Sequence, residues 1–224
     1  MTVLLDVVLP VLLGAAIVFV AQPRLHLDAR PLSRATFYFF SPALVFNSLA
    51  TSDLSAGELG RVALAVFLVT LALWIVSALL VRLVRLEGAA GSAFLLATLF
   101  VNAGNYGLPV TLFAFGETGL AIASVYFAAS SMMQSSLGVY LAARGNATAR
   151  QAAAATFRVP LVYAALLGIA LNLADIALPA WLAKSADLLG QGAIPIMLAL
   201  LGIQLANLMG DRTQRTPALL RPLV

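Results

Sequence analysis

Long apolar runs leave this chain few environments in which it could fold. Seven stretches carry at most one charged residue each, and most approach the roughly 20 residues that a helix needs to cross a bilayer. They cover residues 3–21, 32–50, 62–81, 93–115, 119–142, 159–176 and 188–209. Only 10% of all residues are charged, against about 25% in soluble domains. The sequence therefore predicts an all-α integral membrane protein with about seven spans.

The basic residues predict how those spans are oriented. All but Arg61 and Lys184 of the 13 basic residues follow the first, third, fifth or seventh span. Because cytoplasmic loops collect lysine and arginine, we expect an external N-terminus and cytoplasmic loops after the odd-numbered spans. This is the topology of a multi-pass protein of the cell (inner) membrane. It also explains the net charge of +4 without a nucleic-acid partner.

Two pairs of segments resemble each other. Residues 8–17 resemble residues 159–169, and residues 42–50 resemble residues 195–202, so span one matches span six and span two matches span seven. The matched spans would enter the membrane from opposite sides, as in transporters built from inverted repeats. Chance similarity between leucine- and alanine-rich helices is the alternative. We expect a first five-helix repeat at 1–150 and the start of a second at 151–224, with three helices missing.

The fourth span carries the most informative cluster, which consists of Asn102, Gly104, Asn105, Gly107 and Pro109. Pro109 cannot donate to the carbonyl of Asn105, so the helix should break. Unpaired backbone inside a bilayer survives only beside protein or a polar cavity. A half-helix starting near Pro109 would offer N–H groups to an anion, and one ending near Asn102 would offer carbonyls. The alternative is a kink packed by small residues and glued by asparagines.

The fifth span holds a second polar group, Ser130, Ser131, Gln134, Ser135 and Ser136. Ser131, Gln134 and Ser135 are candidates for lining a substrate path. They could equally be contacts between helices, worth about 0.6 kcal/mol each.

Other polar positions receive plainer interpretations. Asn47 in span two and Gln191 in span seven each lie near a proline and indicate kinks, while Asp175 and Asp187 are expected to be solvated. The chain has no cysteine and a single histidine, His26, and it shows no catalytic or phosphate-binding motif. We therefore expect no enzyme activity, no cofactor and no metal. An ion channel would need a charged ring or a carbonyl filter, and neither pattern is present.

The stretch 102–109 resembles the broken-helix motif of the auxin efflux carrier family, whose bacterial members include proteins described as malate or malonate permeases. Residues 38–46 resemble that family's second span, and residues 193–202 resemble its seventh. The resemblance implies ten spans in two inverted repeats. The fourth and ninth would be broken and cross near the substrate, as in sodium/proton antiporters and bile acid symporters. It also implies that Asn102 and Asn105 contribute to that site.

The favoured function is a secondary carrier of small organic anions such as dicarboxylates, acting in the lipid bilayer by alternating access. A coupling proton or sodium ion and a homodimer are both left open. The alternative is a transport-incompetent module that needs the missing helices or a partner. Two departures from the family pattern bear on this choice. The chain stops before a second broken helix, and Val159 precedes Pro160 where the family often has asparagine.

Overall fold

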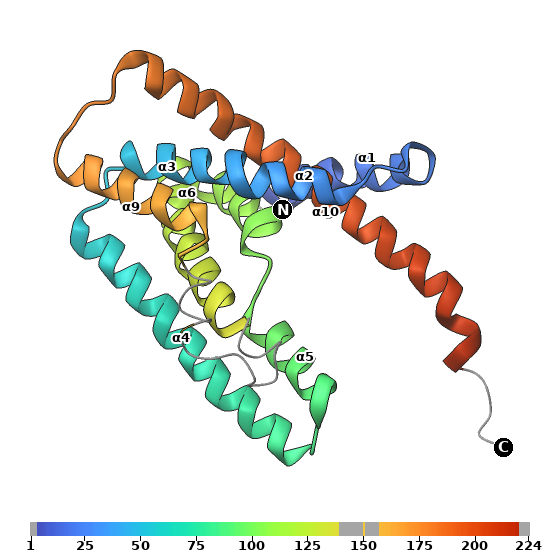
Figure 1. Ribbon diagram of the computed structural model, residues 1–224. Helices are drawn as coiled ribbons and strands as arrows, with labels where there is room; N and C mark the ends of the chain where they lie inside the picture. The colour runs from blue at the N-terminus through green and yellow to red at the C-terminus, as the bar shows by residue number, and fades with distance from the viewer. Residues whose placement is uncertain (1–3, 139–149, 151–156, 220–224) are drawn as a thin grey trace.

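The computed structural model describes residues 4–138, 150 and 157–219 (Figure 1). The described residues form helices and connecting turns, with no strand among them. The helices are α1 (Leu9–Leu25), α2 (Ala29–Ala35), α3 (Ser41–Ala50), α4 (Ala56–Leu83), α5 (Gly88–Leu99), α6 (Leu108–Met133), α9 (Pro160–Leu173) and α10 (Ala180–Leu219). Four π-helical turns extend them: η1 (Leu4–Val8), η2 (Thr36–Phe40), η3 (Ala103–Gly107) and η4 (Gln134–Gly138).

Four of these helical segments are long and apolar enough to cross a membrane. They are Leu4–Leu25, Ala56–Leu83, Ala90–Gly138 and Ala180–Gly210, and a shorter apolar helix covers Pro160–Leu173. The third segment is 49 residues long and is interrupted twice, at residues 100–102 and at Gly116. The chain is thus a helical membrane protein with about four to six long apolar helices. The count of seven crossings and the topology remain predictions.

The start of α4 shows why sequence hydropathy misplaces a helix end. The apolar run suggested a start at residue 62, but the helix begins at Ala56 because Ser55 and Glu58 form a capping box. The Ser55 hydroxyl accepts from the Glu58 N–H at 3.3 Å, and the Glu58 carboxylate accepts from the Ser55 N–H at 2.9 Å. Two backbone donors that the helix itself cannot satisfy are thereby paired.

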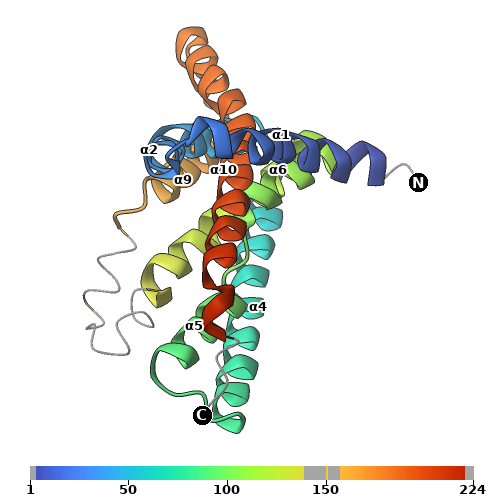
Figure 2. The ribbon, with the colours of Figure 1, turned by 90° about the vertical axis from the view of Figure 1, so that its right-hand side faces the viewer.

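One layer of the molecule is formed by α1, α3, α9 and α10. Helix α1 packs against α10, and α3 packs against both α9 and α10 (Figures 1 and 2). Glycines make two of these contacts close. A Cβ at Gly202 of α10 would collide with the carbonyl of Ala15 in α1, and a Cβ at Gly168 of α9 would lie 2.8 Å from the carbonyl of Phe46 in α3. Such contacts bring backbones together and favour a rigid layer.

Helices α4 and α5 extend to one side of this layer in both views (Figures 1 and 2). Helix α6 lies between α4 and the layer, and it packs against the layer through two clusters of buried apolar side chains. Val45, Ala121 and Leu161 belong to the cluster shared with α3 and α9. Leu108 and Met197 belong to the cluster shared with α1, α3 and α10. The residues of the predicted helix break are therefore held between the layer and the extended helices.

Candidate functional site

The fourth apolar segment is broken, as the sequence predicted, but the second half-helix starts earlier than expected. Helix α5 ends at Leu99, Phe100 adopts extended angles, and helical structure resumes at Ala103. The expected start near Pro109 is wrong because Asn102 caps the new helix. Its Oδ1 accepts a hydrogen bond from the Asn105 N–H at 3.1 Å. An asparagine at this position satisfies a donor that the helix leaves free.

Pro109 lies after the π-turn η3 and is fully buried. The Leu108 N–H donates to the carbonyl of Ala103, five residues back instead of four, so this turn of the helix contains one extra residue. Pro109 then removes the next donor, and the carbonyl of Asn105 loses its usual helical partner. The proline therefore perturbs the start of a half-helix rather than marking its first residue.

Gly116 divides the long helix α6 into two arms. Its angles, φ 64° and ψ −156°, lie outside the helical region and suit glycine. The two arms lie side by side. A Cβ at Gly104, before the turn, would lie 3.0 Å from the ring of Phe127, after it, and a Cβ at Gly119 would meet Thr111. This helical hairpin brings the polar residues of the predicted fifth span back beside the break.

A hollow of about 330 Å³ opens at that place, and we name it the break hollow. It is lined by Leu99, Phe100, Val101, Asn102, Ala103, Gly104, Asn105, Tyr126, Phe127, Ser130, Ser131, Gln134 and Gln204. No charged side chain lines it in the described part of the chain. Its polar groups are amides, hydroxyls and backbone, which can donate to an anion or accept from a donor.

Five of the eight residues predicted for the site therefore share one hollow: Asn102, Gly104, Asn105, Ser131 and Gln134. The other three lie elsewhere. Gly107 lines a neighbouring hollow of about 500 Å³ together with Asn102 and Tyr106. Pro109 is buried in the helix, and the Ser135 hydroxyl donates to the carbonyl of Ser131 at 2.9 Å.

Gln204 of α10 is a lining residue that sequence reasoning missed. Its only signal was an amide inside an apolar span. The carboxamides of Asn105, Gln134 and Gln204 form no hydrogen bond with another described residue. Amides from three helical segments thus line one hollow, with Asn105 half-buried and Gln134 and Gln204 exposed, and each can donate to or accept from a polar ligand.

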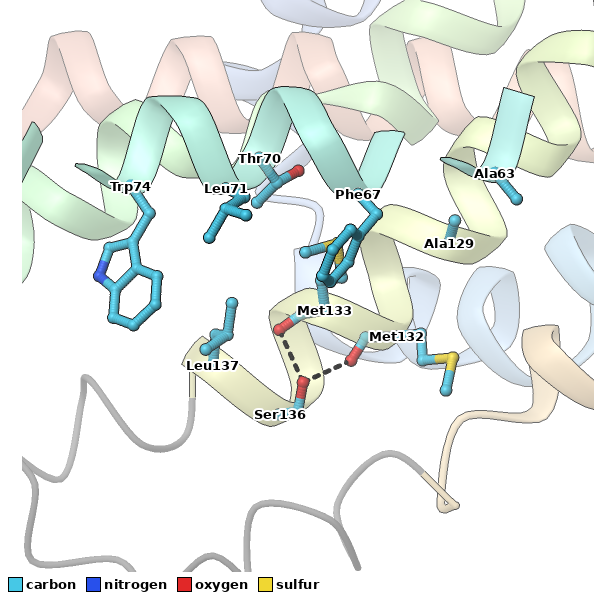
Figure 3. Close-up of a pocket in the computed structure, with 10 residues that line it drawn as sticks. All are labelled: Ala63, Phe67, Thr70, Leu71, Trp74, Ala129, Met132, Met133, Ser136 and Leu137. Carbon is cyan, nitrogen blue, oxygen red and sulfur yellow. Dashed lines mark hydrogen bonds between the residues drawn. The ribbon is translucent and has the colours of Figure 1, made fainter. Parts of the chain in front are cut away.

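A larger hollow of about 470 Å³ lies between α4 and the end of α6 and has a different character (Figure 3). Phe67, Leu71 and Trp74 of α4 point toward Met133 and Leu137 in Figure 3. The Ser136 hydroxyl there donates to the carbonyls of Met132 and Met133, both at 3.1 Å. An apolar lining whose hydroxyl is already bonded does not suit an anion, and no predicted site residue lines it.

Comparisons with known proteins indicate the family of this chain. The profile of a family described as membrane transport protein matches residues 3–218. An uncharacterized transporter of Methanothermobacter thermautotrophicus is 31% identical over 181 residues, which are 80% of this chain and 59% of that protein. The chain thus spans less than two thirds of that relative's length. A family match over nearly the whole sequence leads to one conclusion: the chain belongs to the membrane transport protein family, which is that of the auxin efflux carriers.

Proposed function

We propose that this chain carries the first half of the substrate site of a secondary transporter for small organic anions such as dicarboxylates. The observation that carries the proposal is the helix break at residues 100–102, which opens into a hollow lined by neutral donors. Helix η3–α6 begins at that break, and its N-terminal end bears partial positive charge. A carboxylate placed there would meet amide and hydroxyl donors without a competing protein carboxylate.

Charge balance also favours an anion. In an amide-lined site, the charge of an anionic ligand is compensated by several hydrogen bonds and by the partial positive charge of the helix N-terminus. The ligand can then dissociate without breaking an ion pair. Asn105 is the most informative side chain, because it is half-buried and its carboxamide is not used by a described residue. Binding there would be weak enough for release to either side of the membrane.

The helix pairing supports an inverted repeat with repeats at 1–150 and 151–224. If span one corresponds to span six and span two to span seven, a pseudo-two-fold axis would turn the α1–α10 pair into the α9–α3 pair. Both pairs pack extensively. Leu49 lies seven residues after Pro42 and contacts α9 at Gly168, while Gly202 lies seven residues after Pro195 and contacts α1 at Ala15. Matching positions of spans two and seven thus lie at the two close contacts, which supports the proposed repeat.

Alternating access would then move the hairpin that holds the break against the layer of α1, α3, α9 and α10. Close glycine contacts within that layer favour its movement as one body. We propose the cell (inner) membrane with an external N-terminus as the setting.

Uptake into vesicles tests the proposal. Vesicles containing the protein should take up labelled malonate or another small dicarboxylate faster than empty vesicles. Asn105→Ala should reduce uptake at least tenfold, because one donor to the substrate carboxylate is lost. Asn207→Ala is the matched control, since Asn207 is exposed on α10 and lines neither the break hollow nor its neighbour. Undiminished uptake by Asn105→Ala would remove the proposed site.

A further inference from the structure

Two hollows meet at the opposite end of the hairpin from the break, around its turn at Gly116. One is about 200 Å³ and the other about 300 Å³, and both are lined by Asn47, Ser48, Glu117 and Asp187. Gln191 lines the first, and Asp53 lines the second. We name these six residues the acidic mouth. They come from α3, the loop after it, the hairpin turn and α10, so four separate segments meet there.

The acidic mouth is negative and has no local compensation. Asp53, Glu117 and Asp187 contribute three carboxylates, and no basic residue lines either hollow in the described part of the chain. Lys184 lies one turn before Asp187 on α10 but lines neither hollow. Carboxylates that line adjoining hollows raise the local concentration of cations and repel anions. The mouth therefore has the opposite electrostatic character from the break hollow.

The carboxylate of Asp187 is held in place by two amides from different helices. The Asn47 amide donates to one carboxylate oxygen at 3.3 Å, and the Gln191 amide donates to the other at 2.7 Å. Each amide uses its nitrogen in this way, which leaves its carbonyl oxygen available. Asp187 was expected to be merely solvated. It is exposed, but it also joins α3 to α10.

Ser48 supplies an independent sign of a ligand. Ser48 lines both hollows and is only 6% exposed, and its hydroxyl and that of Ser124 are the two buried side-chain oxygens of the described residues that have no hydrogen-bond partner. Thr36, Thr70 and Thr111 satisfy their hydroxyls by donating to the carbonyl four residues back. Ser48 does not take this ordinary solution for a helical hydroxyl. A buried oxygen left without a partner beside carboxylates is suited to a cation.

We propose that the acidic mouth binds a small monovalent cation, through the Asp187 carboxylate, the Ser48 hydroxyl and the amide oxygens of Asn47 and Gln191. Hard cations prefer such oxygen ligands. A divalent ion would require several carboxylates together. No group of three or more acidic, histidine or cysteine side chains that could hold a metal ion is found among the described residues. One carboxylate with neutral oxygens therefore matches a single positive charge.

The position suggests what such a cation would do. Glu117, at the hairpin turn, lines the first hollow together with Asn47 of α3 and Asp187 of α10. A cation there would attract the hairpin to the layer and stabilise the arrangement in which they meet. Its use as a coupling ion rests on the proposed function, whereas its binding does not.

Thermal unfolding of the purified chain in detergent tests the binding without any substrate. Sodium chloride should raise the unfolding temperature by about 3 °C relative to choline chloride at equal ionic strength, because a ligand stabilises the state that binds it. Asp187→Asn should abolish this sodium-specific shift. Ser48→Ala should reduce it with little effect on the fold, because no hydrogen bond is removed.

Asp175→Asn is the matched control, since it removes the same charge from a residue that lines neither hollow. Asp175 has φ 52°, which asparagine tolerates, so this variant should retain the full sodium shift. An unchanged shift in Asp187→Asn would overturn the proposal. Equal effects of choline and sodium would overturn it too, as would a larger shift with magnesium at the same ionic strength. Because uptake is not measured, failure of the anion site would leave this result intact.

Discussion

The ring of Phe127 lies directly over Gly104, so that a side chain on Gly104 would come within 3.0 Å of the ring carbons. These two residues belong to opposite arms of the hairpin, and both line the break hollow. Their contact sets how closely the start of the broken half-helix approaches the polar residues of the other arm. Any group added between them would widen the hollow or displace the ring.

Gly104→Ala should therefore weaken both the fold and the site. Overpacking of a tight contact costs about 1–3 kcal/mol, and Phe127 has to move to admit a methyl group. We expect a lower unfolding temperature in detergent and reduced anion uptake. Gly60→Ala is the control, because a Cβ at Gly60 of α4 meets no atom within 4 Å. Equal behaviour of the two variants would contradict the packing described at the hairpin.

Substitutions at Asn102 should separate its capping role from its proposed contact with substrate. Asn102→Ala should cost about 1 kcal/mol of stability, because the cap to the Asn105 N–H is lost. Asn102→Asp should keep the cap and the stability, but its carboxylate should repel an anion and lower uptake more than tenfold. Stability is read from thermal unfolding and transport from vesicle uptake. An aspartate variant that transports normally would argue against an anionic substrate.

Pro109→Ala should impair transport more than membrane insertion. Restoring a backbone donor at this position allows an ordinary helical turn to replace the π-turn, which would rotate Asn102 and Asn105 away from the hollow. Uptake and the amount of protein in the membrane fraction should be compared. Pro179→Ala, at the start of α10, is expected to leave both unchanged. Failure of Pro109→Ala to insert would indicate a purely structural proline.

Asn172→Ala should destabilise the layer, although Asn172 itself lines neither the break hollow nor the acidic mouth. The Asn172 amide donates to the carbonyls of Ala50 at 3.2 Å and Ser52 at 2.7 Å, which ties the end of α9 to the end of α3. Removing a donor from two partly buried carbonyls costs about 1–3 kcal/mol. The unfolding temperature should fall, while the sodium-specific shift persists. A variant as stable as the parent protein would show that the α3–α9 contact does not depend on this amide.

Sequence reasoning located the helix break but not its details. The Asn/Gly/Pro cluster predicted the interruption, because a proline disrupts the helix at its own position in the sequence. The start at Ala103 escaped prediction, since it depends on the Asn102 side chain turning back to cap its own helix. Gln204 and the acidic mouth escaped for another reason. They are assembled from segments far apart in the chain, and hydropathy carries no information on which helix faces which.

The two arms of the hairpin are joined by a turn of a single residue. Gly116 alone separates the helix that begins at the break from the helix that carries Ser131 and Gln134. With one residue between the arms, a displacement of one arm is expected to shift the start of the other, and a force on Glu117 would act directly beside the turn. If both proposed sites bind as inferred, an ion at the turn and an organic anion at the far end of the hairpin would influence each other's binding through this short connection.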